Sequence, residues 1–209
     1  MIVMQSSPHL QTQDQKLNEL ILVVKTNHLF PNERWQGLKT NEIDQYKHII
    51  DHRKEFLPRY LMEQDEAYKQ IIPYLIFTHD NKFFLMQRQS NASEKRLQNK
   101  YSLGIGGHIR QEDMINQSIF SWAKREFHEE IEYKGNLAIK QLGIINDDSN
   151  DVGKVHLGLV LLLDGDSDNI AIKSELKSGD LVSPATCNTL YSSLESWSQF
   201  VLLYLQNNR

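Results

Sequence analysis

Short apolar runs separated by polar residues dominate the pattern of hydrophobic positions along the chain. Runs of about four to eight residues bounded by turn residues are typical of β-strands. They predict strands at residues 17–25, 71–77, 83–86, 101–109, 137–147 and 154–165. A polar Thr-His-Asp-Asn-Lys segment joins the second and third of these and predicts a hairpin. The last run is apolar almost throughout, which favours a strand buried on both faces of a sheet.

Three other segments repeat apolar residues at helical spacing. Helices are predicted over residues 42–64, with an interruption around Pro58, over 114–132, and near the C-terminus over 190–205. One face of the last helix carries a stripe that we assign to core packing, made of Leu190, Leu194, Trp197, Val201 and Leu205. The order strand, hairpin, helix, strands, helix predicts a layered α+β domain.

Length and composition fit one folded domain with an extension. The chain has 209 residues, of which 40% are hydrophobic and 24% charged. A net charge of -4 and a pI near 6.1 argue against a stable nucleic-acid complex. The single cysteine, Cys187, excludes internal disulfides and a cysteine zinc cluster. The chain shows no signal-peptide pattern, and its longest apolar stretch, 157–163, is too short for a bilayer, so we expect a cytoplasmic protein without a membrane partner.

The most informative segment is residues 106–133, which ends in a cluster of acidic side chains. Glu126, Glu129 and Glu130 fall within one arc of the predicted helix at about 100° per residue. Like charges at these spacings cost roughly a few tenths of a kcal/mol per pair, and Arg125 offsets part of this through Glu129. A divalent cation would turn the repulsion into binding, because Mg²⁺ and Mn²⁺ prefer hard oxygen ligands.

The alternative to a site is a solvated helix face, which is the usual meaning of a run of charges. The helical register argues against it. Ile119 precedes Glu126 by seven residues and Glu130 by eleven, and both separations return to nearly the same side of a helix. The side that begins apolar therefore ends in carboxylates, and we expect these to be partly desolvated at the floor of a pocket.

Together these residues resemble the Nudix box, whose family pattern is G-x5-E-x7-R-E-U-x-E-E-x-G-U, with U an apolar residue. Gly107 matches the leading glycine, and Arg-Glu-Phe-His-Glu-Glu at residues 125–130 matches the central R-E-U-x-E-E without a gap. The resemblance implies the Nudix fold over residues 71–209, an α/β/α sandwich around a mixed β-sheet. Residues 1–70 would then form an N-terminal α/β extension.

The match departs from the pattern on both sides of its centre. Arg125 lies 18 positions after Gly107, where the pattern has 14, so the loop carries four extra residues. Asp113 takes the place of the first glutamate when counted from the glycine, and Gln117 when counted from the arginine. In the family that acid supports the box arginine, and we assign the supporting role to Asp113. Downstream, Glu132 stands where the pattern has glycine.

The resemblance also implies a chemistry: hydrolysis of a phosphoanhydride bond in a nucleoside diphosphate linked to another group, or in a related diphosphate. By similarity, the Gly107 carbonyl with Glu126, Glu129 and Glu130 would hold Mg²⁺ or Mn²⁺, which activates a water for attack at phosphorus. Arg125 completes the catalytic set. The base is open between a box glutamate and an acid of a later loop, and the candidates outside the box are Asp147, Asp148 and Glu175.

The implied substrate is a small phosphorylated, nucleotide-like molecule, and Arg88 and Lys154 are candidates for binding it. A homodimer is compatible with the resemblance, since many Nudix proteins dimerise. One alternative is a non-catalytic nucleotide-binding sensor with a Nudix fold, although a sensor has no need of all three glutamates. Another is an isopentenyl diphosphate isomerase-like protein, but Cys187 lies downstream of the box and not upstream. Residues 164–175 carry acids at calcium-loop positions, yet a polar turn between strands is the preferred interpretation.

Overall fold

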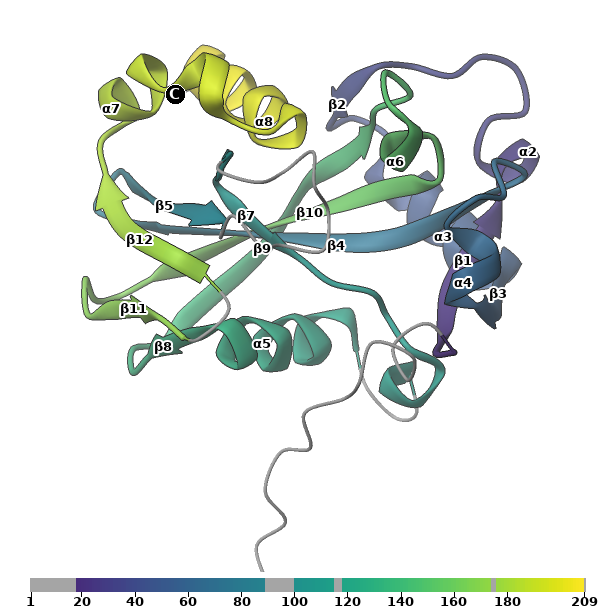
Figure 1. Cartoon of the computed structure of the whole chain (residues 1–209), viewed down its shortest axis with the longest axis horizontal. Helices are drawn as coiled ribbons and strands as arrows, with labels where there is room; N and C mark the ends of the chain where they lie inside the picture. The colour runs from purple at the N-terminus through teal and green to yellow at the C-terminus, as the bar shows by residue number, and fades with distance from the viewer. Residues whose placement is uncertain (1–17, 89–99, 115–117, 174–175, 209) are drawn as a thin grey trace, which may run out of the picture.

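One mixed β-sheet with helices on both faces forms the body of the protein in the computed structural model (Figure 1). The structure describes residues 18–88, 100–114, 118–173 and 176–208. The main path of the sheet consists, in spatial order, of β12 (Leu176–Val182), β5 (Lys82–Arg88), β4 (Tyr68–His79), β10 (His156–Gly165), β9 (Leu137–Asn146) and β2 (Gly37–Lys39). β4 and β10 run in parallel, whereas the other neighbours on this path are antiparallel. The mixed sheet predicted from the sequence is therefore confirmed.

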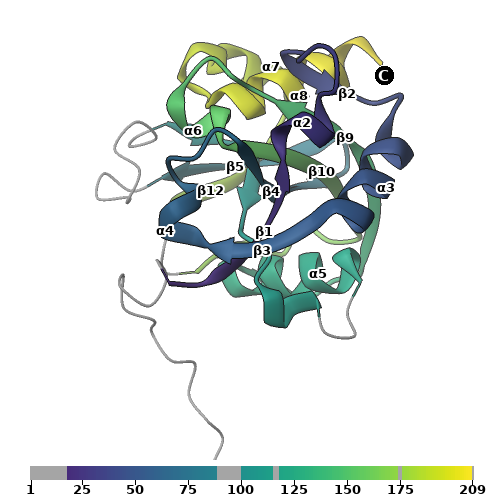
Figure 2. The ribbon, with the colours of Figure 1, turned by 90° about the vertical axis from the view of Figure 1, so that its right-hand side faces the viewer.

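Helices cover the two faces of this sheet and complete the predicted α/β/α sandwich. One face carries α5 (Ile119–Glu130), and the opposite face carries α7 (Pro184–Thr189) and α8 (Ser196–Asn207) (Figures 1 and 2). The remaining elements that lead to and from these helices are β6 (Tyr101–Ser102), β7 (Gly104–Gly106), the 3-10 turns η2 (Gln111–Met114) and η3 (Tyr191–Ser193), β8 (Ile131–Tyr133), α6 (Asp151–Lys154) and β11 (Ile170–Ile172). β7 pairs with β4, so the glycine-rich segment enters α5 from the centre of the sheet.

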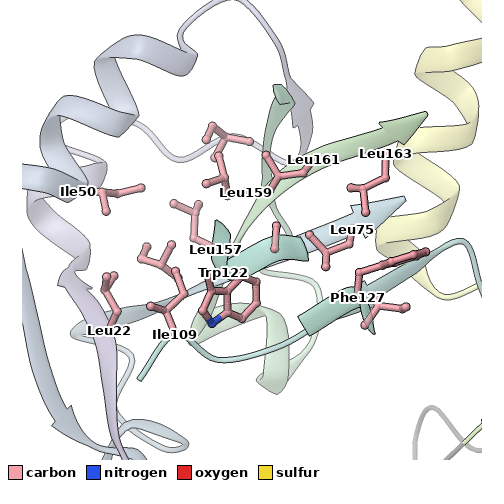
Figure 3. Close-up of a cluster of buried hydrophobic side chains, with 14 of the residues drawn as sticks. Leu22, Ile50, Leu75, Ile109, Trp122, Phe127, Leu157, Leu159, Leu161 and Leu163 are labelled. Atoms are coloured by element: carbon pink, nitrogen blue, oxygen red, sulfur yellow. The ribbon is translucent and has the colours of Figure 1, made fainter. Parts of the chain in front are cut away.

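Alternating side chains of the central strands fill the core on both faces. Leu75 of β4 and Leu161 of β10 belong to the cluster that contains Trp122 and Phe127 of α5 (Figure 3). The side chains in between face the other way and pack beneath α8, in a cluster that includes Tyr74, Ile76, Val160, Leu162, Val201 and Leu202. Successive strand residues point to opposite faces. The apolar run of β10 is thus a strand buried on both sides, as its composition predicts.

The N-terminal third contributes strands to the same sheet. β1 (Leu20–Lys25) pairs with β3 (Lys54–Pro58) and with the beginning of β4, while β2 pairs with β9. The helices between these strands are α2 (Thr26–Leu29), α3 (Ile43–Arg53) and α4 (Arg59–Met62) (Figure 2). The expected boundary at residue 70 falls within β4. The division into an extension, 1–70, and a domain, 71–209, stays a prediction.

The helix predicted over residues 42–64, with an interruption around Pro58, is wrong for residues 54–58, whereas Arg59–Met62 after the proline is helical again. α3 ends at Arg53, and the next five residues form β3, which pairs with β1 in antiparallel register. Backbone pairing with a distant strand thus outweighs a local helical pattern. At the C-terminus α8 begins at Ser196 and not at residue 190, although Leu190 and Leu194 still pack in the cluster beneath it.

Two smaller features complete the fold. Cys187 is fully buried and packs like a small apolar side chain. β10 ends at Gly165 and β11 begins at Ile170, so the acidic segment between them connects two strands, as the preferred interpretation of residues 164–175 predicts. Asp166 of this segment accepts hydrogen bonds from Asn136, which precedes β9. Over the ranges that the structure describes, no helix is both long and apolar enough to cross a membrane.

Candidate active site

α5 presents its acidic end at a fixed angle because its core face is anchored by apolar side chains. Trp122, Ala123 and Phe127 are fully buried against the sheet. The helix begins with an N-cap, in which the Ser118 hydroxyl accepts a hydrogen bond from the backbone N–H of Ser121 at 3.2 Å. Packing and cap together set the register that places the box glutamates at the last turn.

Asp113 supports the box arginine, as its place in the pattern predicts. Its carboxylate accepts hydrogen bonds from the Arg125 guanidinium at 2.7 Å, the Arg110 backbone N–H at 2.9 Å and Trp122 Nε1 at 3.2 Å. The side chain is only 6% exposed. Burial alone would raise the pKa of Asp113, but the hydrogen bonds from Arg110 and the charges of Arg110 and Arg125 lower it below its usual value. The four-residue-longer loop therefore still delivers an acid to the arginine.

Glu126 lies against the leading glycine of the box. A Cβ added to Gly107 would come 2.2 Å from Glu126 Oε1, so the absence of a side chain there makes room for this carboxylate. Burial, followed by repulsion from Glu129 and Glu130, raises the pKa of Glu126 to about 7. The predicted partial desolvation is thus present at this glutamate.

The other two glutamates are arranged differently. Glu129 is 54% exposed and accepts a hydrogen bond from Arg125 at 2.5 Å. The backbone carbonyl of Glu130 accepts a hydrogen bond from the Lys173 N–H at 2.8 Å, which ties the end of α5 to the segment after β11. Among the described residues, no three His, Cys, Asp or Glu side chains are grouped as a ready metal site. Metal binding by the three glutamates and Gly107 therefore stays a prediction.

A cavity of about 120 Å³ opens beside Gly107 on the side of the sheet that α8 covers. Its walls come from β4, from the segment after β7, from the loop between β9 and β10, and from the first turn of α8. None of the box glutamates lines it, although Gly107 does. His108 and Glu195 line this cavity and were not predicted from the sequence, and Trp197, which was assigned to core packing, lines it too. Only the position of His108, directly after the box glycine, could have drawn attention to it.

The loop between β9 and β10 is held in place by residues of the N-terminal segment. Asp147 accepts hydrogen bonds from Gln36 and from Ser196 of α8, each at 2.5 Å, and Asp148 pairs with the fully buried Lys69 at 2.6 Å. Burial would raise the pKa of both carboxyls. Hydrogen bonds from Ser149, Ser196 and Gln36 lower the pKa of Asp147, and the hydrogen bond and charge of Lys69 lower that of Asp148. Both candidate bases are thus engaged as anchors of the loop.

Comparison with known proteins identifies the family of the chain. No family model matches the sequence, but a related protein and a solved structure do. Protein YmaB from Bacillus subtilis (strain 168) is 33% identical over 217 residues, which cover 91% of this chain and 99% of that protein. The crystal structure of Tm1382, provisionally assigned as a Nudix hydrolase, superimposes with a TM-score of 0.74 and 27% identity over 91% of this chain and 100% of that one. The chain belongs to the Nudix hydrolase superfamily.

A more distant Nudix-fold structure shares the architecture alone. A bifunctional NMN adenylyltransferase/ADP ribose pyrophosphatase from Francisella tularensis, solved with AMP and a manganese ion, is 14% identical with a TM-score of 0.50. The match covers 80% of this chain and 46% of that one. Nudix enzymes typically use divalent metals, and the Nudix fold indicates pyrophosphohydrolase activity.

The remaining predicted Nudix site residues lie at the periphery or outside the described structure. Lys154 of α6 pairs with Asp151 at 3.1 Å and with Glu66 at 3.7 Å. Arg88 is the last residue of β5, and its side chain is outside the described part. Glu175 is likewise outside the described residues. The substrate-binding roles of Arg88 and Lys154 stay predictions.

Proposed function

We propose that the chain is a metal-dependent hydrolase that cleaves a phosphoanhydride bond of a nucleoside diphosphate linked to another group, or of a related diphosphate. The observation that carries the proposal is the half-buried carboxylate of Glu126, which fills the space beside Gly107 and has Glu129 and Glu130 as neighbours on the same helix end. A solvated helix face would leave this carboxylate in water. Perturbed carboxylates in such positions are typical of metal ligands and acid–base groups.

The donors at this helix end fit Mg²⁺ or Mn²⁺, since both ions prefer oxygen ligands. The carboxylates of Glu126, Glu129 and Glu130 with the Gly107 carbonyl would hold the metal, which when bound neutralises a diphosphate and acidifies a water. Glu129 must exchange its contact with Arg125 for this role. The raised pKa of Glu126 supports the fit, because a cation would relieve the repulsion that contributes to it.

The protein's own part in the reaction is to accept the proton of the attacking water and to hold the substrate. A box glutamate suits the first role better than Asp147 or Asp148. Hydrogen bonds from Ser149, Ser196 and Gln36 lower the pKa of Asp147. The hydrogen bond from Lys69 lowers that of Asp148, so both aspartates are weak bases. Arg125, held by Asp113, keeps the end of α5 in place while this happens.

The test is product release from a panel of nucleotide sugars, dinucleoside polyphosphates, ADP-ribose, NADH and nucleoside triphosphates with Mg²⁺ or Mn²⁺. We expect turnover of one class and a loss of at least roughly 100-fold in Glu130→Gln, since even the residues that only hold metal ligands in place cost about 10–100-fold when mutated. Glu132→Gln is the matched control, because Glu132 lies two residues further on and its side chain is 61% exposed. Turnover that survives in Glu130→Gln would exclude the site. No turnover, but a ligand-induced rise in the unfolding temperature, would indicate a sensor.

A further inference from the structure

The cavity beside Gly107 is placed to receive the part of a substrate that adjoins its phosphates. Gly107 belongs to both regions, because the Glu126 carboxylate fills the space next to it and the glycine also lines the cavity. The cavity's volume of about 120 Å³ is close to that of an apolar cavity of ~150 Å³ that holds one benzene ring. It therefore suits one flat six-membered ring, which can be a ring by itself or the amino-bearing ring of a larger heterocycle. That this ring belongs to a phosphorylated substrate rests on the proposed function.

The charges around the cavity disfavour a phosphate inside it. Its described lining contains Asp147 and Glu195 but no lysine or arginine. The N-terminal end of a helix attracts anions, but at α8 this place is taken, since Ser196 Oγ donates a hydrogen bond to Asp147 at 2.5 Å. An uncharged group that donates hydrogen bonds is the better occupant.

His108 lines this cavity, and its neighbours determine which of its ring nitrogens is the hydrogen-bond acceptor. The side-chain amide of Gln70 donates from Nε2 to the Met62 carbonyl at 3.1 Å, so its Oε1 must accept from His108 Nε2, which lies 2.7 Å away. With its proton on Nε2, the neutral imidazole ring has its lone pair on the other nitrogen, Nδ1. No hydrogen bond joins Nδ1 to another described residue.

The walls of the cavity are aromatic and firmly held. The Trp197 ring meets Tyr74 edge to face, with ring centroids 5.4 Å apart. The loop after β9, which also lines the cavity, is fixed through Asp147 to Gln36, and the Lys69 ammonium donates to the Gly153 carbonyl at 2.8 Å. A preformed wall of this kind lowers the cost of ordering on binding.

We propose that this cavity binds an uncharged, flat heterocycle bearing an amino group, of the kind found in adenine and cytosine, as the non-phosphate end of the substrate. The amino group donates a hydrogen bond to Nδ1 of His108, and the ring packs against Trp197. A keto group in the same place would bring its oxygen, a hydrogen-bond acceptor, next to Nδ1, which is also an acceptor, so neither atom would have a hydrogen bond.

Two pairs of nucleosides test the proposal without metal or hydrolysis. Adenosine and inosine differ by the exchange of an amino group for a keto group, and so do cytidine and uridine. Calorimetric or ligand-observed NMR titration should give at least tenfold tighter binding of the amino member of at least one pair. Equal binding within both pairs, a preference for the keto members, or no binding of any of the four at millimolar concentration would overturn the proposal.

A pair of histidine variants locates the effect. His108→Leu should reduce the amino preference to less than about twofold, whereas His48→Leu, at an exposed position of α3, should keep it. A preference that survives in a folded His108→Leu protein would contradict the assignment. If that variant does not fold, the ¹⁵N shift of His108 Nδ1 on addition of adenosine to the wild type gives the answer, and an unchanged shift contradicts it. Turnover that is lost in Glu130→Gln would still support the proposed hydrolase activity, whatever these binding experiments show. The hydrolase proposal and the proposal for the cavity can therefore fail separately.

Discussion

Replacing Asp113 with alanine should destabilise the protein and misplace the box, because this carboxylate has three partners. Its loss leaves the N–H of the fully buried Trp122 without an acceptor, which costs about 1–3 kcal/mol. It also breaks the ion pair with Arg125, whose side chain is 31% exposed, so that solvent screening limits this contribution to about 1 kcal/mol. Together we expect about 3 kcal/mol, or a fall of about 6–12 °C in the unfolding temperature of a chain of this size.

Urea denaturation of Asp113→Ala beside Glu112→Ala measures this loss. Glu112 is the neighbouring acid, but its side chain is 62% exposed and only pairs with Arg110 at 3.5 Å, so its removal should cost less than about 0.5 kcal/mol. Because the folded pKa of Asp113 is lowered, its contribution is complete above the unfolded pKa of 3.8 and is lost as the pH falls through the folded value. Equal stability of the two variants near neutral pH would refute this explanation of how Asp113 holds the box arginine.

Three further changes probe the box and the cavity. Because the pKa of Glu126 is raised, the folded, metal-free protein keeps a proton on this carboxyl between pH 4.5 and about 7, where the unfolded chain has lost it. The stability of the folded protein should therefore fall as the pH rises through this window. Glu126→Gln should abolish this contribution to the pH dependence of the unfolding temperature. Gly107→Ala should displace the Glu126 carboxylate and reduce turnover at least tenfold while circular dichroism shows an intact fold; full activity would contradict the contact. Gln36→Ala should loosen the loop that Asp147 anchors and raise KM more than it lowers kcat, whereas a fall in kcat alone would argue against a role in binding.

The fold and the box were predictable from the sequence wherever the residues that determine a feature lie close together in the chain. The acidic helix follows from the register of Ile119 and Glu126, and the support of Arg125 by Asp113 follows from counting along the box. β3 was not predictable, because its strand conformation depends on pairing with β1, whose partner residues lie 30 to 38 positions earlier in the chain.

The cavity beside the box has no local signature either. His108 follows the box glycine, but its hydrogen-bonding state depends on Gln70 of β4. The lining residue Asp147 is held by a contact with Gln36, and Trp197 comes from the C-terminal helix. Five segments that are far apart in the chain contribute to the cavity and its support, and only the folded structure brings them together.

Direct titration of Mn²⁺, followed by electron paramagnetic resonance of the free ion, tests the metal site itself. The glutamates of α5 should bind the ion in the wild type, and Glu126→Gln should weaken binding at least tenfold, whereas the exposed control Glu132→Gln should bind like the wild type. Equal binding by all three proteins, or no binding by the wild type at millimolar Mn²⁺, would contradict a metal-dependent hydrolase built on these glutamates.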